Sequence, residues 1–212
     1  MHIPDGFLTV STSAGAGVVA AVAVGAAVRG AARQLPPERV PMLGVGAAFI
    51  FAAQMVNFPV VGGTSGHLLG AALAVMLLGL PGAMLAMFTV VLLQCLLFQD
   101  GGLLALGANT LNMAVIGPVV AWLVLRALRR ANGPNGWGAV MVAAWASVMA
   151  AALACAAELA ISGTVPTQSA LAAMGSVHAL IGVGEAVLTV AALRVVQAAL
   201  PEHSAVREAL PS

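Results

Sequence analysis

The sequence predicts an all-α polytopic membrane protein, a seven-helix transmembrane bundle that forms one domain over residues 1–212. Hydrophobic residues make up 61% of the chain and charged residues only 7%, whereas soluble domains carry about 25% charged residues. The mean hydropathy is +1.05. Long apolar segments alternate with short clusters of proline, glycine and arginine. Nothing in this pattern indicates a separate soluble module.

Apolar segments of near-spanning length define the seven helices, because a transmembrane helix needs about 20 mostly apolar residues. The predicted spans are residues 10–29, 41–57, 67–80, 82–98, 103–130 (a loop or partial helix followed by a span), 137–161 and 174–200. Pro59 and Pro81 end the second and third, since a residue that precedes proline disfavours the helical conformation. In the glycine-rich loop 60–66, Thr64 and Ser65 are placed to cap the next helix.

The basic residues predict the orientation. All eight are arginine, at positions 29, 33, 39, 126, 129, 130, 194 and 207. With seven spans and an external N-terminus, every arginine falls on the cytoplasmic side, as the positive-inside rule requires. The tail, residues 201–212, is then cytoplasmic, and the N-terminal segment, residues 1–8, lies at the external face.

The N-terminal segment contains a chelating pattern. If Met1 begins the chain with an unformylated amine, that amine and the His2 amide nitrogen close a five-membered ring on a metal ion. The same amide and the His2 imidazole Nδ1 close a six-membered ring. Four nitrogens in a plane suit Ni(II) or Cu(II), and binding would release the amide proton. The alternative is that an initiator Met followed by His is a coincidence.

His67 is the candidate for the fourth nitrogen, because the predicted topology brings it to the same external face. Other polar residues are expected to orient the ligands or to gate the site: Asp5, Asn57, Thr64, Ser65, Asp100, Asn109 and His178. Their alternative role is to form hydrogen bonds between helices. For Gln94 this alternative is the favoured interpretation.

Two carboxylates fall within predicted spans, Glu158 in the sixth and Glu185 in the seventh. Ionisable residues inside a membrane segment are costly, and they are usually functional or paired. Each therefore either joins two helices as a buried carboxyl or takes a direct part in transport. Cys95 and Cys155 lack the spacing of a metal site, and we interpret them as packing residues.

Catalytic motifs are absent from the sequence. There is no G-x-x-x-x-G-K-S/T phosphate loop, no H-E-x-x-H pattern and no paired nucleophile and base. We therefore expect no enzymatic activity, and nothing indicates a nucleic-acid partner. Two alternatives are a membrane metalloenzyme, whose metal His67, His178 and Glu158 or Glu185 would hold, and a self-sufficient metal permease.

Four blocks of the sequence are distinctive: MHIPDGF at 1–7, QMVNFPVVGGTSGHLLG at 54–70, LLFQDGGLLALGANTLNM at 96–113 and HALIGVGEA at 178–186. Together they resemble the substrate-binding components, of NikM and CbiM type, of energy-coupling-factor transporters for nickel and cobalt. The resemblance implies a six-helix core with an additional N-terminal helix. It also implies a metal held by Met1, His2 and His67, and a place in a prokaryotic plasma or inner membrane. Cobalt-type members more often resemble MHIMEGF at the start, so Ile3-Pro4-Asp5 favours nickel.

The resemblance also implies partners and a function. A transmembrane coupling subunit, cytoplasmic ATPase subunits and a small accessory membrane subunit would accompany this chain. The expected function is high-affinity capture of Ni²⁺, or of Co²⁺, from the external face for ATP-driven import. A cobalt-specific member of the same family is the alternative.

Overall fold

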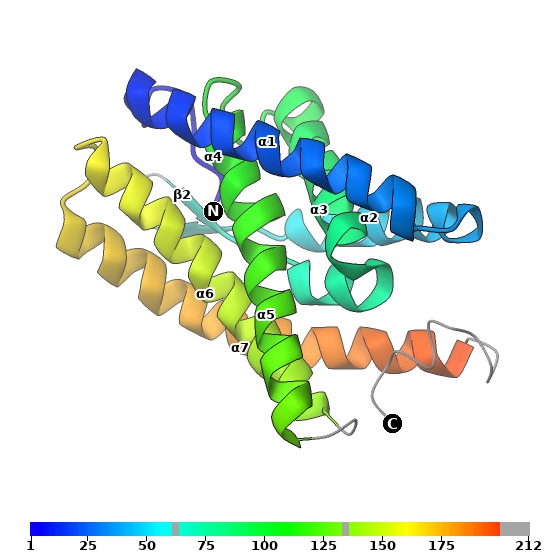
Figure 1. The fold of residues 1–212 in the computed structure, drawn as a ribbon. Helices are drawn as coiled ribbons and strands as arrows, with labels where there is room; N and C mark the ends of the chain where they lie inside the picture. The colour runs from blue at the N-terminus through cyan, green and yellow to red at the C-terminus, as the bar shows by residue number, and fades with distance from the viewer. Residues whose placement is uncertain (61–63, 133–135, 200–212) are drawn as a thin grey trace.

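The computed structural model describes residues 1–60, 64–132 and 136–199, and these form a helical bundle with one small hairpin (Figure 1). The elements are α1 (Val10–Gln34), η1 (Pro37–Arg39), α2 (Val40–Gln54), β1 (Phe58–Val60), β2 (Thr64–Gly66), α3 (Ala71–Phe98), α4 (Leu106–Thr110), η2 (Leu111–Ile116), α5 (Gly117–Asn132), α6 (Trp137–Ile161) and α7 (Thr167–Ala199). Among the described residues, five helices are long and apolar enough to cross a membrane. The prediction of an all-α polytopic membrane fold is confirmed.

The third and fourth predicted spans belong to one bent element, α3. Its two helical segments meet at Gly79, which has φ 69° and ψ 173°, a conformation that only glycine adopts without strain. Pro81 does not end the helix, because it lies in the first turn of the second segment, where its missing N–H is not needed. α4, η2 and α5 follow one another without a break and count as one helix. The seven predicted spans thus correspond to six helices in the described chain, and the predicted number is corrected to six.

The bend in α3 returns the chain to the end of the bundle where it entered. Near the bend, Gly82 lies against Leu35, at the C-terminal end of α1. At the opposite end, His67 precedes α3 and Asp100 follows it, and both contact His2. Both ends of α3 therefore lie beside His2, and the bend lies at the opposite end of the bundle.

Several helix boundaries also differ from the predicted ones. α1 continues to Gln34 rather than stopping at Arg29, and α2 ends at Gln54 rather than at residue 57. α7 begins at Thr167, directly after Pro166 and seven residues before the predicted start at residue 174. The predicted tail, 201–212, lies outside the described residues.

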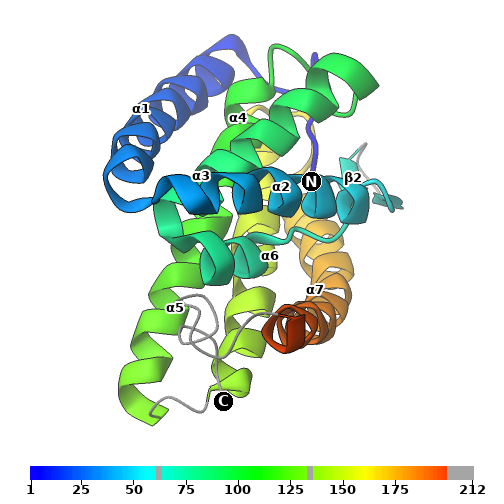
Figure 2. The ribbon, with the colours of Figure 1, turned by 90° about the vertical axis from the view of Figure 1, so that its right-hand side faces the viewer.

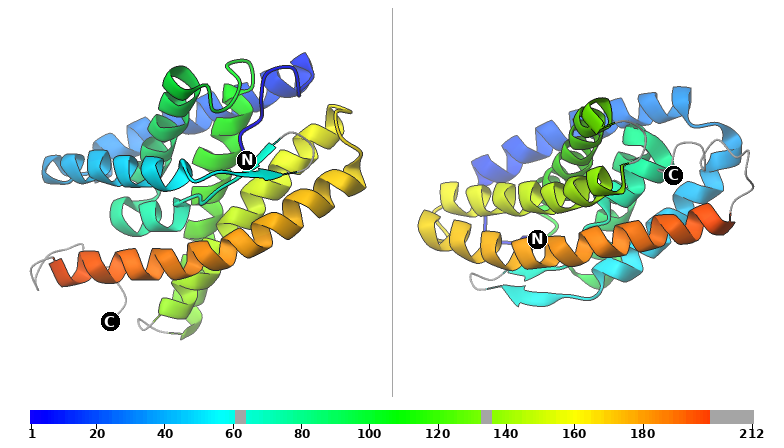
Figure 3. Two further views of the ribbon diagram at one scale, coloured as in Figure 1. Left: turned by 180° about the vertical axis from the view of Figure 1, so that it is seen from behind. Right: turned by 90° about the horizontal axis from the view of Figure 1, so that it is seen from below.

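The glycine-rich loop before His67 contains an antiparallel hairpin, which the sequence did not predict. Phe58 pairs with Gly66 and Pro59 with Ser65. The predicted capping of the next helix by Thr64 and Ser65 is wrong, because α3 begins only at Ala71, six residues after Ser65, with Gly70 as its N-cap. The two views in Figure 3 show the N-terminus beside this hairpin and the α6–α7 pair.

The N-terminal segment passes into the bundle before α1 begins. Met1 and Ile3 are fully buried, whereas α1 itself lies on the outside, where it packs against α4 and α3 (Figure 2). The core around the N-terminus is built mostly from α3, η2, α6 and α7. A chain terminus with its amine is therefore placed among apolar helices, where its polar groups need partners.

Candidate metal-binding site

The N-terminal segment is fixed by hydrogen bonds of its backbone. The Ile3 N–H donates to the Asn109 side-chain oxygen at 2.8 Å, and the Asn109 amide donates back to the Ile3 carbonyl at 3.1 Å. The same carbonyl accepts from the N–H of Gly102 at 2.9 Å. A Cβ on Gly102 would overlap Asp5, so glycine is required for this close approach.

Asp5 anchors the segment one step further along. Its carboxylate accepts hydrogen bonds from the backbone N–H groups of Leu103 at 3.1 Å, Leu104 at 2.8 Å and Ala105 at 3.3 Å. A carboxylate is favourable beside such a run of backbone N–H groups. Asp5 therefore positions Met1 and His2 from a distance, through the backbone.

A chain of side-chain amides sets the tautomer of His2. The His2 Nε2–H donates to Gln94 at 3.0 Å, and the Gln94 amide donates to Gln54 at 3.0 Å. Gln54 in turn donates to the carbonyl of Leu69 at 2.7 Å. Because Nε2 carries the proton, Nδ1 keeps a lone pair, and Nδ1 is the nitrogen that can chelate together with the His2 amide. Gln94 thus contacts His2 directly and does more than link helices.

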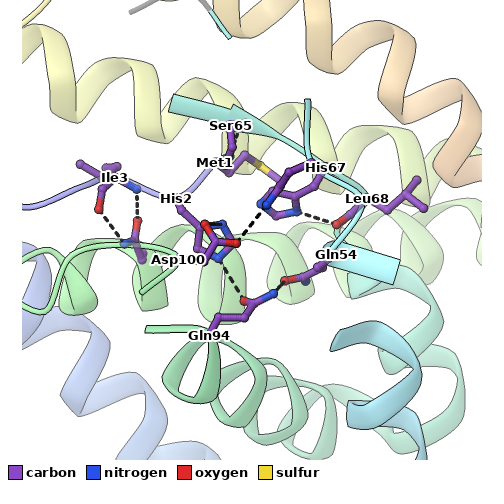
Figure 4. Close-up of polar contacts among 11 residues, drawn as sticks. Met1, His2, Ile3, Gln54, Ser65, His67, Leu68, Gln94 and Asp100 are labelled. Atoms are coloured by element: carbon purple, nitrogen blue, oxygen red, sulfur yellow. Dashed lines mark hydrogen bonds and ion pairs between the residues drawn. The ribbon is translucent and has the colours of Figure 1, made fainter. Parts of the chain in front are cut away.

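His67 presents its other ring nitrogen. Its Nδ1–H donates to the carbonyl of Leu68 at 2.7 Å, and its buried Nε2 has no hydrogen-bond partner among the described residues. The His2 and His67 rings are stacked, with centroids 4.7 Å apart and planes inclined by 29°. Figure 4 shows both rings beside Met1, with Gln94 and Gln54 on the side of His2.

The amine of Met1 lies close to the hairpin. It donates to the backbone carbonyl of Ser65 and, at 3.2 Å, to the Ser65 hydroxyl. Burial lowers the pKa of this amine to about 5. Burial, and then the nearby amine, lower the pKa of His2 to about 4 and that of His67 well below its usual range. All three nitrogens are therefore unprotonated at neutral pH, the state that metal binding needs.

Side chains alone do not form a metal site here. Within the described ranges, no three His, Cys, Asp or Glu side chains gather closely enough to hold a metal ion. A cation between His2 and His67 would therefore take further nitrogens from the main chain. The Met1 amine and the His2 amide are the adjacent ones.

Asp100 lies beside His2, and Asn57 contacts Asp100. Asp100 Oδ2 accepts from the Asn57 side-chain amide at 3.0 Å, and Asp100 Oδ1 lies 3.2 Å from His2 Nδ1. No hydrogen bond joins Oδ1 and Nδ1. Their roles as orienting residues stay predictions.

Comparison with known proteins assigns the chain to a family. Residues 2–203 match the family model described as "Cobalt uptake substrate-specific transmembrane region", CbiM. This chain belongs to that family. The match includes the N-terminal segment from His2, the hairpin, His67 and all the long helices, so it concerns the whole arrangement rather than one motif.

Relatives within and around this family are named for two metals. A fused nickel transport protein of Rhodobacter capsulatus is 34% identical over an alignment of 226 positions, gaps included, which covers 99% of this chain and 65% of that protein. A cobalt transport protein of Pelobacter propionicus is 39% identical over 146 residues, which cover 68% of this chain and 64% of that protein. The aligned regions thus span about two thirds of these relatives.

A crystal structure shares the fold. A truncated transition metal transporter superposes with a TM-score of 0.88 at 32% identity, covering 95% of this chain and 100% of that one. Family, relatives and fold agree that this chain is a multi-pass membrane protein of a transport family and not an enzyme.

The loop that carries His67 is held by Glu185, a role that the sequence did not reveal. Glu185 reaches from α7 and accepts hydrogen bonds from the backbone N–H groups of Leu69 at 2.8 Å and Gly70 at 2.5 Å. Its carboxylate thereby satisfies the N–H groups of the two residues that lead into α3, the second of which, Gly70, is the N-cap of that helix. Glu185 joins α7 to the residues that directly follow His67.

The remaining predicted residues either form hydrogen bonds with groups other than the three nitrogens or lie outside the described residues. The His178 Nδ1–H donates to the Met174 carbonyl at 2.8 Å, and its buried Nε2 has no hydrogen-bond partner within the described chain. Glu158 accepts from the Asn112 amide at 2.6 Å, which links α6 to η2. Thr64 belongs to β2, but its side chain lies outside the described part of the structure.

Proposed function

We propose that this chain captures Ni²⁺ at the external face of a membrane as the substrate-binding component of an ATP-driven energy-coupling-factor importer, with Co²⁺ as a second ion. The observation that carries the proposal is the buried convergence of the Met1 amine, the open Nδ1 of His2 and the open Nε2 of His67. With the His2 amide, these atoms offer four nitrogens and no protein oxygen or sulfur, a set that suits Ni(II) in a plane.

Capture proceeds by exchange of the water shell of the ion for these nitrogens. The amine leaves its hydrogen bonds to Ser65, the His2 amide gives up its proton, and the two imidazoles bind through the nitrogens that their tautomers leave open. The amide chain to Gln94 and the Leu68 carbonyl keep those tautomers in place, as outer hydrogen bonds do in other metal sites. The cost of burying three polar nitrogens is then offset by the metal bonds.

An external N-terminus follows from the arginines. Arg29 and Arg33 lie near the C-terminal end of α1, Arg126 lies late in α5, and Arg194 lies late in α7. Figure 1 shows these helix ends pointing away from the N-terminus. The positive-inside rule favours a cytoplasmic position for the arginine ends, and this supports an external position for the nitrogen cluster in the proposal.

Import requires partners in this proposal, because the sequence has no phosphate-loop motif for ATP hydrolysis. A transmembrane coupling subunit and cytoplasmic ATPase subunits would supply the energy, and a small accessory membrane subunit would assist. The name and the greater length of the fused Rhodobacter capsulatus protein support a transporter built from several parts. The cobalt relative supports Co²⁺ as the second ion.

Calorimetric titration of the purified chain with Ni²⁺ and Co²⁺ tests the proposal. His67→Ala removes one proposed ligand and is expected to weaken Ni²⁺ binding beyond the roughly 10–100-fold typical of outer-shell changes. The matched control is His178→Ala, a second buried histidine outside the proposed nitrogen set, which is expected to leave tight binding in place. Tight binding that survives His67→Ala but not His178→Ala would contradict the proposal and favour a site made of side chains.

Vesicles that contain this chain alone separate capture from transport. We expect Ni²⁺ binding without ATP-independent uptake into such vesicles. Uptake down a Ni²⁺ gradient by this chain alone would indicate a self-sufficient permease instead.

A further inference from the structure

The proposed nitrogen site is buried, yet a cavity reaches it from one side. Met1 and His67 are fully buried and His2 is 3% exposed. A cavity of about 640 Å³ lies next to them and is lined by His2, Asp5, Ser65 and Asp100, among others. An ion that approaches through this cavity meets the edge of the His2 ring and the carboxylate of Asp100 before the other nitrogens.

The two carboxylates on this cavity are not equivalent. Asp5 is occupied by three backbone N–H groups. Asp100 is held by one hydrogen bond to Oδ2, from Asn57 at 3.0 Å, which leaves Oδ1 turned toward His2. The Asp100 side chain is 19% exposed and that of His2 is 2% exposed, so Asp100 stands between solvent and the ring.

Asp100 and His2 meet at the edge of the cavity. Asp100 Oδ1 and His2 Nδ1 lie 3.2 Å apart without a hydrogen bond between them, and the other ring nitrogen, Nε2, donates to Gln94. A carboxylate oxygen and a ring nitrogen thus lie side by side, an arrangement that a cation bound between them would stabilise. A buried Nδ1 with no hydrogen-bond partner thus points to a ligand at this position.

We propose that Asp100 is a relay carboxylate: its Oδ1 binds the partly hydrated divalent cation from the cavity and passes it to Nδ1 of His2. This inference rests on the proposed function of the nitrogen site. An oxygen ligand can bind the ion while most of its water shell remains, and the nitrogens then replace oxygen and water in turn. Once four nitrogens are bound, Asp100 is no longer a ligand, so the relay lowers the barrier in both directions.

The kinetics of Ni²⁺ binding distinguish a relay from a resident ligand. Association is followed by stopped-flow absorbance of the Ni(II)–nitrogen complex, and dissociation by transfer of Ni²⁺ to excess chelator. In Asp100→Asn we expect both rate constants to fall, association by roughly tenfold or more, as when a charged cleft loses its steering charge. Slower dissociation is the feature that simple attraction between charges does not produce.

Two further variants make the test specific. Glu38→Gln removes the same charge at an exposed position of η1 and is expected to leave both rates unchanged. Asn57→Ala keeps the carboxylate but removes the hydrogen bond that aims it, so both rates should fall by a smaller factor. It also serves as the test if Asp100→Asn does not fold.

The outcomes are separable from those of the proposed function. Unchanged association in Asp100→Asn, or dissociation that stays the same or becomes faster, would overturn the relay while Ni²⁺ binding by the unaltered chain remains. Absence of Ni²⁺ binding by the unaltered chain would instead overturn the proposed function itself.

Discussion

The candidate site is assembled from two arms that are held in different ways. The N-terminal arm, residues 1–5, is fixed by the backbone of Gly102–Ala105 and by Asn109, all close together in sequence. The His67 arm, residues 65–70, is fixed by side chains of Gln54 from α2 and Glu185 from α7. The partners of the first arm come from one short stretch of the chain, whereas those of the second come from two helices, α2 and α7, whose relative positions must be right.

This difference suggests where the site can open. A displacement of α7 relative to α3 would pull on the hydrogen bonds between Glu185 and the residues after His67, and leave the hydrogen bonds of Ile3 to Asn109 and Gly102 intact. We therefore expect the His67 arm to be the part that responds to partner subunits, and the N-terminal arm to keep its position.

The pH dependence of Ni²⁺ affinity tests whether the proton released on binding comes from the His2 amide of the N-terminal arm. With the amine and both imidazoles already neutral above their lowered pKa values, only the His2 amide loses a proton, so affinity should rise about tenfold per pH unit between about pH 6 and 8. Below pH 5 the Met1 amine, whose pKa is about 5, and then His2, whose pKa is about 4, also take up protons, and the dependence should steepen. Calorimetry in buffers of different ionisation enthalpy counts the protons. A flat profile would exclude the amide as a ligand.

Glu185→Gln tests the His67 arm. The glutamine cannot accept from both Leu69 and Gly70, and an unsatisfied buried N–H costs about 1–3 kcal/mol. We expect Ni²⁺ affinity to fall by roughly 10–100-fold. The control is Glu158→Gln, which changes a buried carboxylate bonded to Asn112 rather than to the His67 arm. Equal losses of affinity in both variants would mean that the effect is one of general stability.

Asn109→Ala tests the N-terminal arm. It removes both side-chain hydrogen bonds to Ile3 but leaves the bond from Gly102, so we expect a loss of about tenfold in Ni²⁺ affinity. The control is Asn112→Ala, which changes a neighbouring buried asparagine that bonds Glu158. It should lower the melting temperature without a specific loss of Ni²⁺ affinity. Titration of each variant next to its melting temperature separates the two effects.

Ser65→Ala tests one hydrogen bond between the two arms. The hydroxyl at 3.2 Å is lost, but the Ser65 carbonyl still accepts from the Met1 amine. A neutral hydrogen bond contributes about 0.5–1.5 kcal/mol, and metal binding breaks this one, so its removal should raise Ni²⁺ affinity by roughly 2- to 13-fold. A loss of affinity would show that Ser65 remains bonded in the metal complex.

The sequence allowed more of the N-terminal arm to be predicted than of the His67 arm. A chelating terminus is encoded in adjacent residues, Met1 and His2, so their chemistry can be read without the fold. Most apolar spans were also evident, since bilayer thickness fixes their length. The sequence predicted a helix end at Pro81, whereas the structure has a bend at Gly79, because proline is tolerated in a first helical turn.

The holders of the His67 arm could not be predicted, because they have no local pattern. Glu185 bonds backbone groups that lie 115 and 116 residues earlier in the chain, and backbone groups carry no residue identity. Gln94 was interpreted as a link between helices, although it contacts both Gln54 and His2. The sequence does not show whether a side-chain amide between two helices bonds another helix or a metal-binding residue.

Blocking the Met1 amine tests the central claim most directly. The chain is compared with a version extended by Gly-Gly-Ser before Met1, and with one that carries the same residues after Ser212 as a control. Three residues are used because a single added glycine would create a new four-nitrogen chelate from its amine, two amides and the His2 imidazole. That chelate could bind Ni²⁺ and hide the loss of the Met1 amine. The account predicts that Ni²⁺ affinity falls by more than the roughly 10–100-fold of outer-shell changes in the N-terminal extension, and stays unchanged in the control. Unchanged affinity in both would contradict a site built on the terminal amine.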